Sequence, residues 1–282
     1  MERETRVTVL VENTASGRGM LGEHGLAYCI ETGGAQVLFD TGQTGRVLIH
    51  NAERLGVHLG ATEAVVLSHG HYDHTGGLEE VLGKGSQPRL FLHPGALVTR
   101  FSRGTDGTVR EVGPPPGIEE PSLRESTSSL TFTTSPTEVN EKLTVTGEVP
   151  RRNDFEDTGG DFYLDEGCTE PDPIVDDQAV FFDTPEGTVV LLGCGHAGVI
   201  NTLTYIRELT GGRPISAVIG GMHLLHASEE RMDRTVEALR QMDVNLLAPA
   251  HCTGAQAKAR LWAEFQNCWQ PCTVGSRFEF RE

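Results

Sequence analysis

The 282-residue sequence lacks any apolar run long enough to cross a bilayer, for which a helix needs about 20 such residues. Basic residues are scarce, with 23 Lys and Arg against 40 Asp and Glu, and the formal net charge of −17 argues against broad binding to nucleic-acid phosphates. Residues 1–6 are charged and contain no apolar core of the kind found in a secretory signal. We therefore expect a cytoplasmic protein with a small-molecule substrate and neither a nucleic-acid nor a membrane partner.

Paired cysteines of the zinc-ribbon type are also missing, because the six cysteines are scattered along the chain. We expect reduced thiols, as in most cytosolic proteins, and a local disulfide between Cys268 and Cys272 is the alternative. Glycine is abundant, with 34 residues, and it concentrates at turns and beside histidines, where backbone must approach a ligand closely. The length is sufficient for one large core, and we predict a single domain over residues 1–282.

A dense group of histidines lies between a predicted strand, residues 63–67, and a predicted helix, residues 75–82. Residues two apart in an extended segment point to the same side, so His69 and His71 can bind one ion. Asp73 and His74 fall where the chain turns and can face a second ion. Chance clustering on a solvated loop is the alternative, but desolvating so many polar groups costs free energy unless something binds them. We therefore predict a metal site, with zinc expected and iron or manganese suited to the same ligands.

More histidines follow predicted strands in the C-terminal half, where strands and helices alternate through residues 188–265. This rhythm places His196, His223 and His251 at successive strand ends. The carboxyl ends of neighbouring parallel strands meet at one edge of a sheet, so we expect the three histidines to lie together there.

The motif His69-x-His71-x-Asp73-His74 resembles the metal signature of the metallo-β-lactamase superfamily, and the resemblance extends over most of the chain. Residues 38–42 look like its early strand-Asp-x-Gly element, in which Asp40 can cap the next helix or brace the metal loop. Residues 249–252 look like its last metal-histidine loop. The resemblance implies a four-layer αββα sandwich of the α/β (α+β) class. The fuller set of segments is similar to one branch, the dihydropterin-methyl-ribofuranosylaminobenzene-phosphate synthases: residues 23–25, 68–77, 193–198 and 220–224.

The resemblance also implies two ions, and zinc is the expected metal for both. The first would be held by His69, His71 and His196, and the second by Asp73, His74 and His251. His196 is assigned to the first ion because no histidine lies between His93 and His196 to fill the place of the superfamily's separate upstream histidine.

Two residues near the predicted ions have roles that the sequence leaves open. Cys194 stands near the place of the superfamily's bridging aspartate, and it is either a thiolate ligand or a small residue packed behind His196. His223 is expected at the edge of the site, as a substrate contact or proton carrier. We assign catalytic roles to Asp73 and His223.

Residues 95–177 interrupt the regular pattern with turn-rich, polar stretches, and we interpret them as containing an insertion that forms a lid over the site. Within them, residues 143–152 resemble the branch's Thr-Gly-Glu-x-Pro-Arg segment. Its two arginines can bind a substrate phosphate or carboxylate, although a surface pair beside acidic neighbours is an equal alternative. The predicted substrate-binding residues are His24, Glu148, Arg151 and Arg152.

These features predict a metal-dependent hydrolase, because a bound ion lowers the pKa of water and polarises a substrate oxygen. An ester or phosphoester of a small molecule is the expected substrate. The branch label implies instead the condensation of a pterin with a ribofuranosylaminobenzene phosphate. Three other functions stay open: a nuclease or RNA-processing enzyme, which the charge disfavours, a diiron redox protein, which needs a flavin partner, and a metal-bound binding module without turnover.

Overall fold

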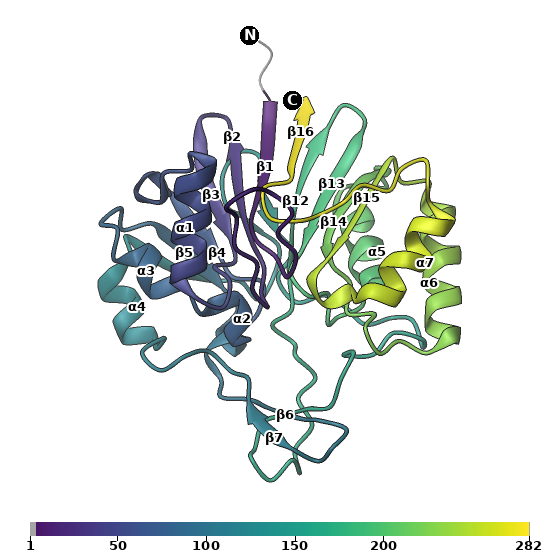
Figure 1. The fold of residues 1–282 in the computed structure, drawn as a ribbon, viewed down its shortest axis with the longest axis horizontal. Helices are drawn as coiled ribbons and strands as arrows, with labels where there is room; N and C mark the ends of the chain where they lie inside the picture. The colour runs from purple at the N-terminus through teal and green to yellow at the C-terminus, as the bar shows by residue number, and fades with distance from the viewer. Residues whose placement is uncertain (1–3, 282) are drawn as a thin grey trace.

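Two β-sheets pack face to face in the computed structural model, which describes residues 4–281, and helices cover the outer face of each sheet (Figure 1). The fold is the four-layer αββα sandwich that the sequence predicts. The apolar core between the sheets contains Tyr28 and Phe39 from one sheet and Val180 and Ile219 from the other, all at most 3% exposed. Each such side chain contributes roughly 1.5–3 kcal/mol through burial.

The first sheet has the spatial order β16-β1-β2-β3-β4-β5-β8, antiparallel up to β3 and parallel from β3 to β8. Its outer face is covered by α1, α3 and α4, whose Leu48, Leu78 and Leu123 are buried against it. The elements are β1 (Glu4–Val11), β2 (Ala27–Thr32), β3 (Ala35–Phe39), α1 (Gly45–Leu55), β4 (Ala64–Val66), α3 (Leu78–Leu82), β5 (Arg89–Leu92), α4 (Glu120–Ser126), β8 (Ser129–Phe132) and β16 (Arg277–Arg281).

The second sheet has the order β15-β14-β13-β12-β10-β9, and α5, α6 and α7 cover its outer face. Strands β13, β14 and β15 are parallel neighbours, so their carboxyl ends share one edge. The elements are β9 (Thr137–Glu138), β10 (Thr144–Val145), β12 (Ala179–Thr184), β13 (Gly187–Leu192), α5 (Val199–Leu209), β14 (Ile215–Gly221), α6 (Glu229–Met242), β15 (Leu246–Ala250) and α7 (Ala255–Glu264).

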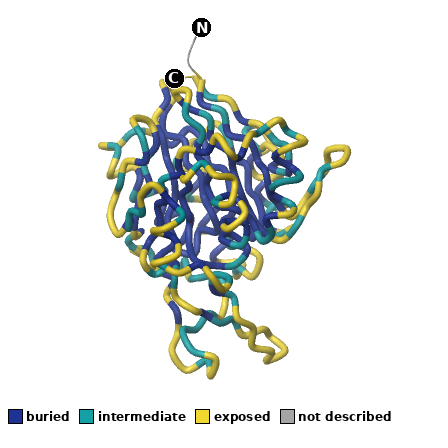
Figure 2. The backbone as a smooth tube through the Cα atoms, turned by 90° about the vertical axis from the view of Figure 1, so that its left-hand side faces the viewer, coloured by how far each residue is buried: buried dark blue, intermediate teal, exposed yellow. Residues whose placement is uncertain are grey.

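A three-stranded sheet projects below the sandwich and consists of β6 (Phe101–Arg103), β7 (Val109–Glu111) and β11 (Phe162–Tyr163) (Figure 1). We call this small sheet the lid. Figure 2 shows that its loops are largely exposed, whereas the strands of the sandwich are buried. Not all of residues 95–177 is insertion, because β8 extends the first sheet and β9 and β10 extend the second.

The structure differs from the sequence-based expectation at two further places. The helix predicted over residues 75–82 is divided into α2 (Tyr72–Thr75) and α3 at Gly76 and Gly77. A Cβ at either glycine would lie within 2.3 Å of a backbone oxygen of the loop after β3, so only glycine permits this approach. Strand β16, which pairs with β1, was not predicted.

Short 3-10 turns complete the chain at η1 (Leu59–Ala61), η2 (Pro94–Leu97) and η3 (His251–Thr253). All six cysteines are free, so Cys268 and Cys272 form no disulfide. Among residues 4–281, no helix combines the length and apolarity that crossing a membrane requires.

Candidate metal centre

The predicted metal ligands converge at the carboxyl ends of strands from both sheets. His69 and His71 lie on the loop after β4, and Asp73 and His74 lie on α2. Across the sandwich, the loops after β13, β14 and β15 carry the remaining members: Cys194 and His196, His223, and His251. Strand order therefore joins His74 and His251, 177 positions apart, in one buried cluster.

The first group consists of three imidazoles that lie against one another. Nε2 of His69 is 2.9 Å from Nδ1 of His71. The ring centroid of His196 lies 4.8 Å from that of His69 and 4.9 Å from that of His71. All three rings are at most 5% exposed.

The second group surrounds a carboxylate oxygen. Oδ2 of Asp73 lies 3.1 Å from Nε2 of His251 and 3.7 Å from Nε2 of His74. The two imidazole Nε2 atoms are 3.3 Å apart. The structure thus brings together Asp73, His74 and His251, as the sequence predicts for the second ion.

Hydrogen-bond partners outside the cluster fix the orientation of three rings. Nδ1 of His74 lies 2.6 Å from Oδ2 of Asp40, and Nδ1 of His251 lies 2.7 Å from Oδ1 of Asn13. Nδ1 of His196 lies 2.8 Å from the carbonyl oxygen of Thr158. In each ring the other nitrogen, Nε2, is left to face the cluster, which is how protein groups orient metal-binding histidines.

Asp40 contacts both the metal loop and one of its histidines. Its carboxylate accepts hydrogen bonds from the backbone N–H of Ser68 (2.6 Å) and the Ser68 hydroxyl (2.7 Å), in addition to its contact with His74. Its backbone lies in the left-handed region, with φ 61°. Asp40 therefore braces the metal loop, and Thr44, whose hydroxyl accepts from Val47 N–H, caps helix α1 instead.

Burial and neighbouring charges shift the pKa values of the two groups in different directions. Burial lowers the pKa of His69 and His196 well below the usual value and that of His71 to about 3. For His74 burial also lowers the pKa, but the carboxylates of Asp40 and Asp73 outweigh it and raise the value to about 9. Burial raises the pKa of Asp73, but the neighbouring His74, with hydrogen bonds from His24 and His251, holds it well below its usual range. The first group is therefore neutral at pH 7, and the second contains an ionised carboxylate.

The cluster fits transition-metal ions. The buried Nε2 atoms of His71 and His196 have no hydrogen-bond partner, which is costly unless a ligand satisfies them. Imidazole nitrogen, carboxylate oxygen and thiol sulfur form a donor set suited to zinc, and iron or manganese accept the nitrogen and oxygen donors. Ligand atoms of several combinations lie within 4.8 Å of one another, including His69, Cys194 and His196, and also His74, Cys194 and His251.

An aromatic residue of the lid covers the first group. The ring centroid of Phe162 on β11 lies 5.0 Å from that of His71, 5.2 Å from that of His196 and 6.0 Å from that of His223. The residue had no distinguishing signal in the sequence, because it lies in a polar, turn-rich stretch. Its ring therefore forms one wall of the site beside the first group.

A buried ion cluster anchors the base of the lid to the metal loop. Arg100 is 2% exposed and forms two hydrogen bonds with Asp176 (2.8 and 3.1 Å) and an ion pair with Asp172 (3.0 Å). Asp176 in turn accepts a hydrogen bond from the N–H of Gly70, between the two metal-loop histidines. Sequence reasoning missed these residues, since nothing local marks their pairing.

Of the other predicted site residues, His24 and His223 lie beside the metal ligands and Glu148 does not. His24 lies at the exposed side of the second group, with Nε2 3.2 Å from Asp73 Oδ2 and its ring 4.8 Å from His251. His223 is close to the first group, 4.2 Å from the ring of His196, and its Nδ1 has no partner. Glu148 is more distant from the ligands and contacts His93 at 3.1 Å.

The arginine pair is not brought into the cluster. Arg151 donates to the carbonyl oxygens of His196 (2.8 Å) and Pro173, so it supports the His196 loop from behind. Arg152 forms an ion pair with Glu208 on α5. Both guanidinium groups have protein partners, and substrate binding by Arg151 and Arg152 stays a prediction.

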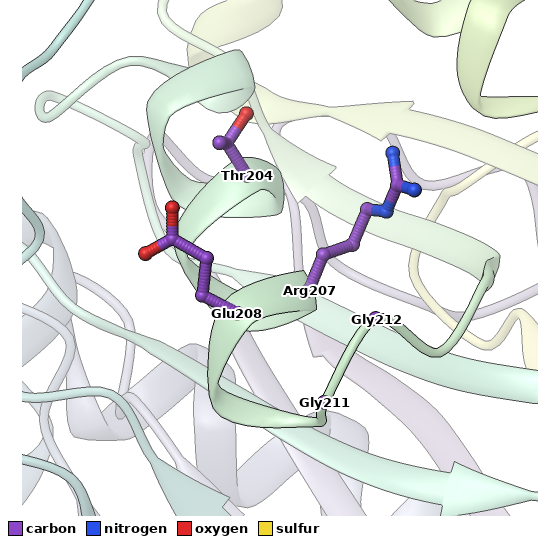
Figure 3. A pocket seen from close by; sticks show the side chains of 5 residues that line it. All are labelled: Thr204, Arg207, Glu208, Gly211 and Gly212. Carbon is purple, nitrogen blue, oxygen red and sulfur yellow. The ribbon is translucent and has the colours of Figure 1, made fainter.

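A surface hollow at the far end of α5 is separate from the cluster (Figure 3). It is lined by Thr204, Arg207, Glu208, Gly211 and Gly212, whereas the His196 loop precedes the first residue of this helix. At 1.5 Å per residue, 11 helical residues separate the two ends by roughly 16 Å. The hollow therefore contributes nothing to the metal centre.

The chain belongs to the metallo-β-lactamase superfamily, whose profile matches residues 21–251 and thus includes every predicted metal ligand. Its fold and its cluster of histidines between two sheets define it as a member.

Several relatives resemble it over nearly their whole length. A crystal structure described as a metal-dependent hydrolase of the β-lactamase superfamily is 30% identical, with a TM-score of 0.82, and the match covers 99% of this chain and 100% of that one. A protein of Methanocaldococcus jannaschii named 7,8-dihydropterin-6-methyl-4-(β-D-ribofuranosyl)-aminobenzene-5'-phosphate synthase is 26% identical over 271 residues, 92% of this chain and 90% of its own length. An uncharacterized protein of the same organism is 30% identical over 256 residues, 90% of this chain and 93% of its own.

Proposed function

We propose that the protein is a metal-dependent hydrolase that holds two ions, zinc being the expected metal, and cleaves an ester or phosphoester of a small molecule. The observation that carries this proposal is the pair of adjacent ligand groups, in which unpartnered buried Nε2 atoms face the cluster. His69, His71 and His196 would hold one ion, and Asp73, His74 and His251 the other. Ions held there would supply Lewis acidity, which polarises a substrate oxygen and lowers the pKa of water.

The chain's own residues then provide proton transfer and positioning. Asp73 remains ionised at neutral pH, so one of its carboxylate oxygens can bind an ion while the other accepts a hydrogen bond from the attacking water. His24 is 3.2 Å from Oδ2 of Asp73 and its side chain is 55% exposed, which allows it to contact the substrate at the exposed side of the second group. His223, whose pKa burial lowers to about 3, is a neutral ring beside His196 that can contact the substrate at the edge of the first group.

The test is a screen of the zinc-, manganese- and iron-loaded protein against p-nitrophenyl esters, phosphomonoesters and phosphodiesters. The matched control is the double variant His69→Ala with His71→Ala, which we expect to lose bound metal and turnover. Hydrolysis that persists in the control at unchanged rate would contradict the proposal, and so would a fully metal-loaded protein inactive against every class.

Condensation is the second candidate, and the named Methanocaldococcus jannaschii relative is the observation that favours it. In that case Lewis acidity would assist departure of a leaving group, such as a phosphate ester, from the methyl carbon of a dihydropterin as that carbon bonds to a ribofuranosylaminobenzene phosphate. Incubation of the two components with the metal-loaded protein, followed by mass analysis of the product, distinguishes condensation from hydrolysis.

A further inference from the structure

The residue that most sets this metal centre apart is Cys194, which the sequence leaves between two interpretations. Its side chain belongs to three groups of ligand atoms: one with His223 and Cys252, and two that join the predicted ligands, with His69 and His196 and with His74 and His251. Cys194 is the one residue that the last two of these groups share. A side chain packed behind His196 would instead contact that ring alone.

The geometry around Cys194 places its sulfur against the second group. Sγ lies 3.1 Å from Nε2 of His74, and the residue is 2% exposed. Nε2 of His196, from the first group, is buried without a partner and is the ring's only free nitrogen, because Nδ1 contacts Thr158. A sulfur in this position can reach an ion on either side.

The backbone permits this position only through Gly193. A Cβ at that residue would lie 2.2 Å from the hydroxyl of Ser68 and 3.2 Å from the carboxylate of Asp40. The end of β13 therefore packs directly against Ser68 and Asp40, the residues of the first sheet that orient its metal ligands. This close approach is what brings Cys194 between ligands that come from two different sheets.

We propose that Cys194 is a metal ligand shared by the two ions, with its thiolate sulfur bridging the site of His69, His71 and His196 and the site of Asp73, His74 and His251. The inference depends on the two-ion centre proposed above. It adds a sulfur donor to a set otherwise made of nitrogen and oxygen, and sulfur favours zinc over manganese.

Cobalt(II) substitution tests the inference without measuring turnover. A cobalt–thiolate bond gives a charge-transfer absorption in the near ultraviolet, and histidine or carboxylate ligands do not. We expect this band to appear when cobalt is added to the metal-free protein and to grow through two equivalents, because a bridging sulfur bonds to both ions. A band that saturates at one equivalent would contradict bridging.

Variants identify the sulfur responsible. Cys194→Ser should remove the band and weaken binding of at least one cobalt ion by about tenfold or more. Cys194→Asp should lack the band but still bind two ions, since a carboxylate can bridge them. The matched control is Cys252→Ser, because the Cys252 thiol donates to the Cys194 carbonyl oxygen (3.3 Å) and its sulfur is the competing candidate ligand, in a group with Cys194 and His223. This variant should keep the band.

The outcomes separate this inference from the proposed function. A wild-type protein that binds no cobalt would refute the metal centre itself. Two bound cobalt ions without a charge-transfer band would leave the centre intact and refute only the thiolate ligand, as would a band that survives in Cys194→Ser or disappears in Cys252→Ser. Circular dichroism of each variant verifies that it is folded.

Discussion

Replacing Asp40 by Asn tests whether a single buried carboxylate orients the second metal site. Asp40 is fully buried, and its Oδ2 is 2.6 Å from Nδ1 of His74 and 2.7 Å from the hydroxyl of Ser68. The substitution preserves shape and the acceptor for Ser68 N–H, but an amide N–H₂ then faces His74. Asparagine tolerates the left-handed backbone at this position (φ 61°), so backbone strain does not confuse the result.

The expected effect is on metal affinity. Without the carboxylate, His74 loses the partner that holds its proton on Nδ1 and leaves Nε2 free for a metal. Loss of such an orienting partner typically weakens metal binding 10–100-fold, which corresponds to roughly 1.4–2.7 kcal/mol. Asp40 contacts His74 directly but reaches His69 through the Ser68 hydroxyl, which lies 2.9 Å from Nδ1 of His69. We therefore expect the ion bound by His74 to be affected more strongly than the ion bound by His69.

The assay is a zinc titration against a competing chelator, with the two dissociation constants fitted separately. Asp177→Asn is the matched control, since Asp177 is also a buried carboxylate near the cluster but accepts from the backbone N–H of Ala197. It should change the affinity of the second ion less than about threefold. Unchanged affinity in Asp40→Asn, or an equal loss in both variants, would refute the orienting role.

Three other predictions follow from the same geometry. His196→Ala should abolish turnover and lower the affinity for the ion held by His69 and His71 at least about tenfold, with an unchanged far-UV circular dichroism spectrum. Full metal content with full activity in this variant would limit His196 to a substrate contact. Phe162→Ala should raise KM roughly two- to tenfold with metal content unchanged, because an aromatic contact contributes about 0.5–1.5 kcal/mol. The control Tyr163→Ala alters the next residue of β11, which points to the opposite face, and an equal effect there would contradict the assignment. The third concerns pH: burial raises the pKa of Asp177 to about 6, above the unfolded value, so its stabilising contribution is complete below about pH 4 and lost as the pH rises through 6. Chemical denaturation of the chelator-treated protein should show the unfolding free energy of wild type falling relative to Asp177→Asn by up to about 3 kcal/mol between pH 4 and pH 7, and parallel profiles would contradict this.

The sequence by itself determined the features that depend on near neighbours. Alternation of apolar residues and strand-helix rhythm predicted most elements, and the alternation expected through residues 188–265 is present as β13, α5, β14, α6, β15 and α7. The spacing of His69, His71, Asp73 and His74 predicted ligands on one turn, because backbone geometry over six residues is set locally. Parallel β13, β14 and β15 then explain why histidines at successive strand ends share an edge.

Only the tertiary structure decided which distant residues complete the site. Asn13 contacts His251 across 238 positions, and Asp176 contacts Gly70 across 106. Phe162 covers the histidines from a lid whose strands are only two or three residues long. Such contacts leave no periodic or local pattern in the sequence, since they depend on how two sheets and an insertion pack together. The same is true of Cys194, because a cysteine at a strand end can be a ligand or a packing residue until the opposing sheet fixes what lies on either side of its sulfur.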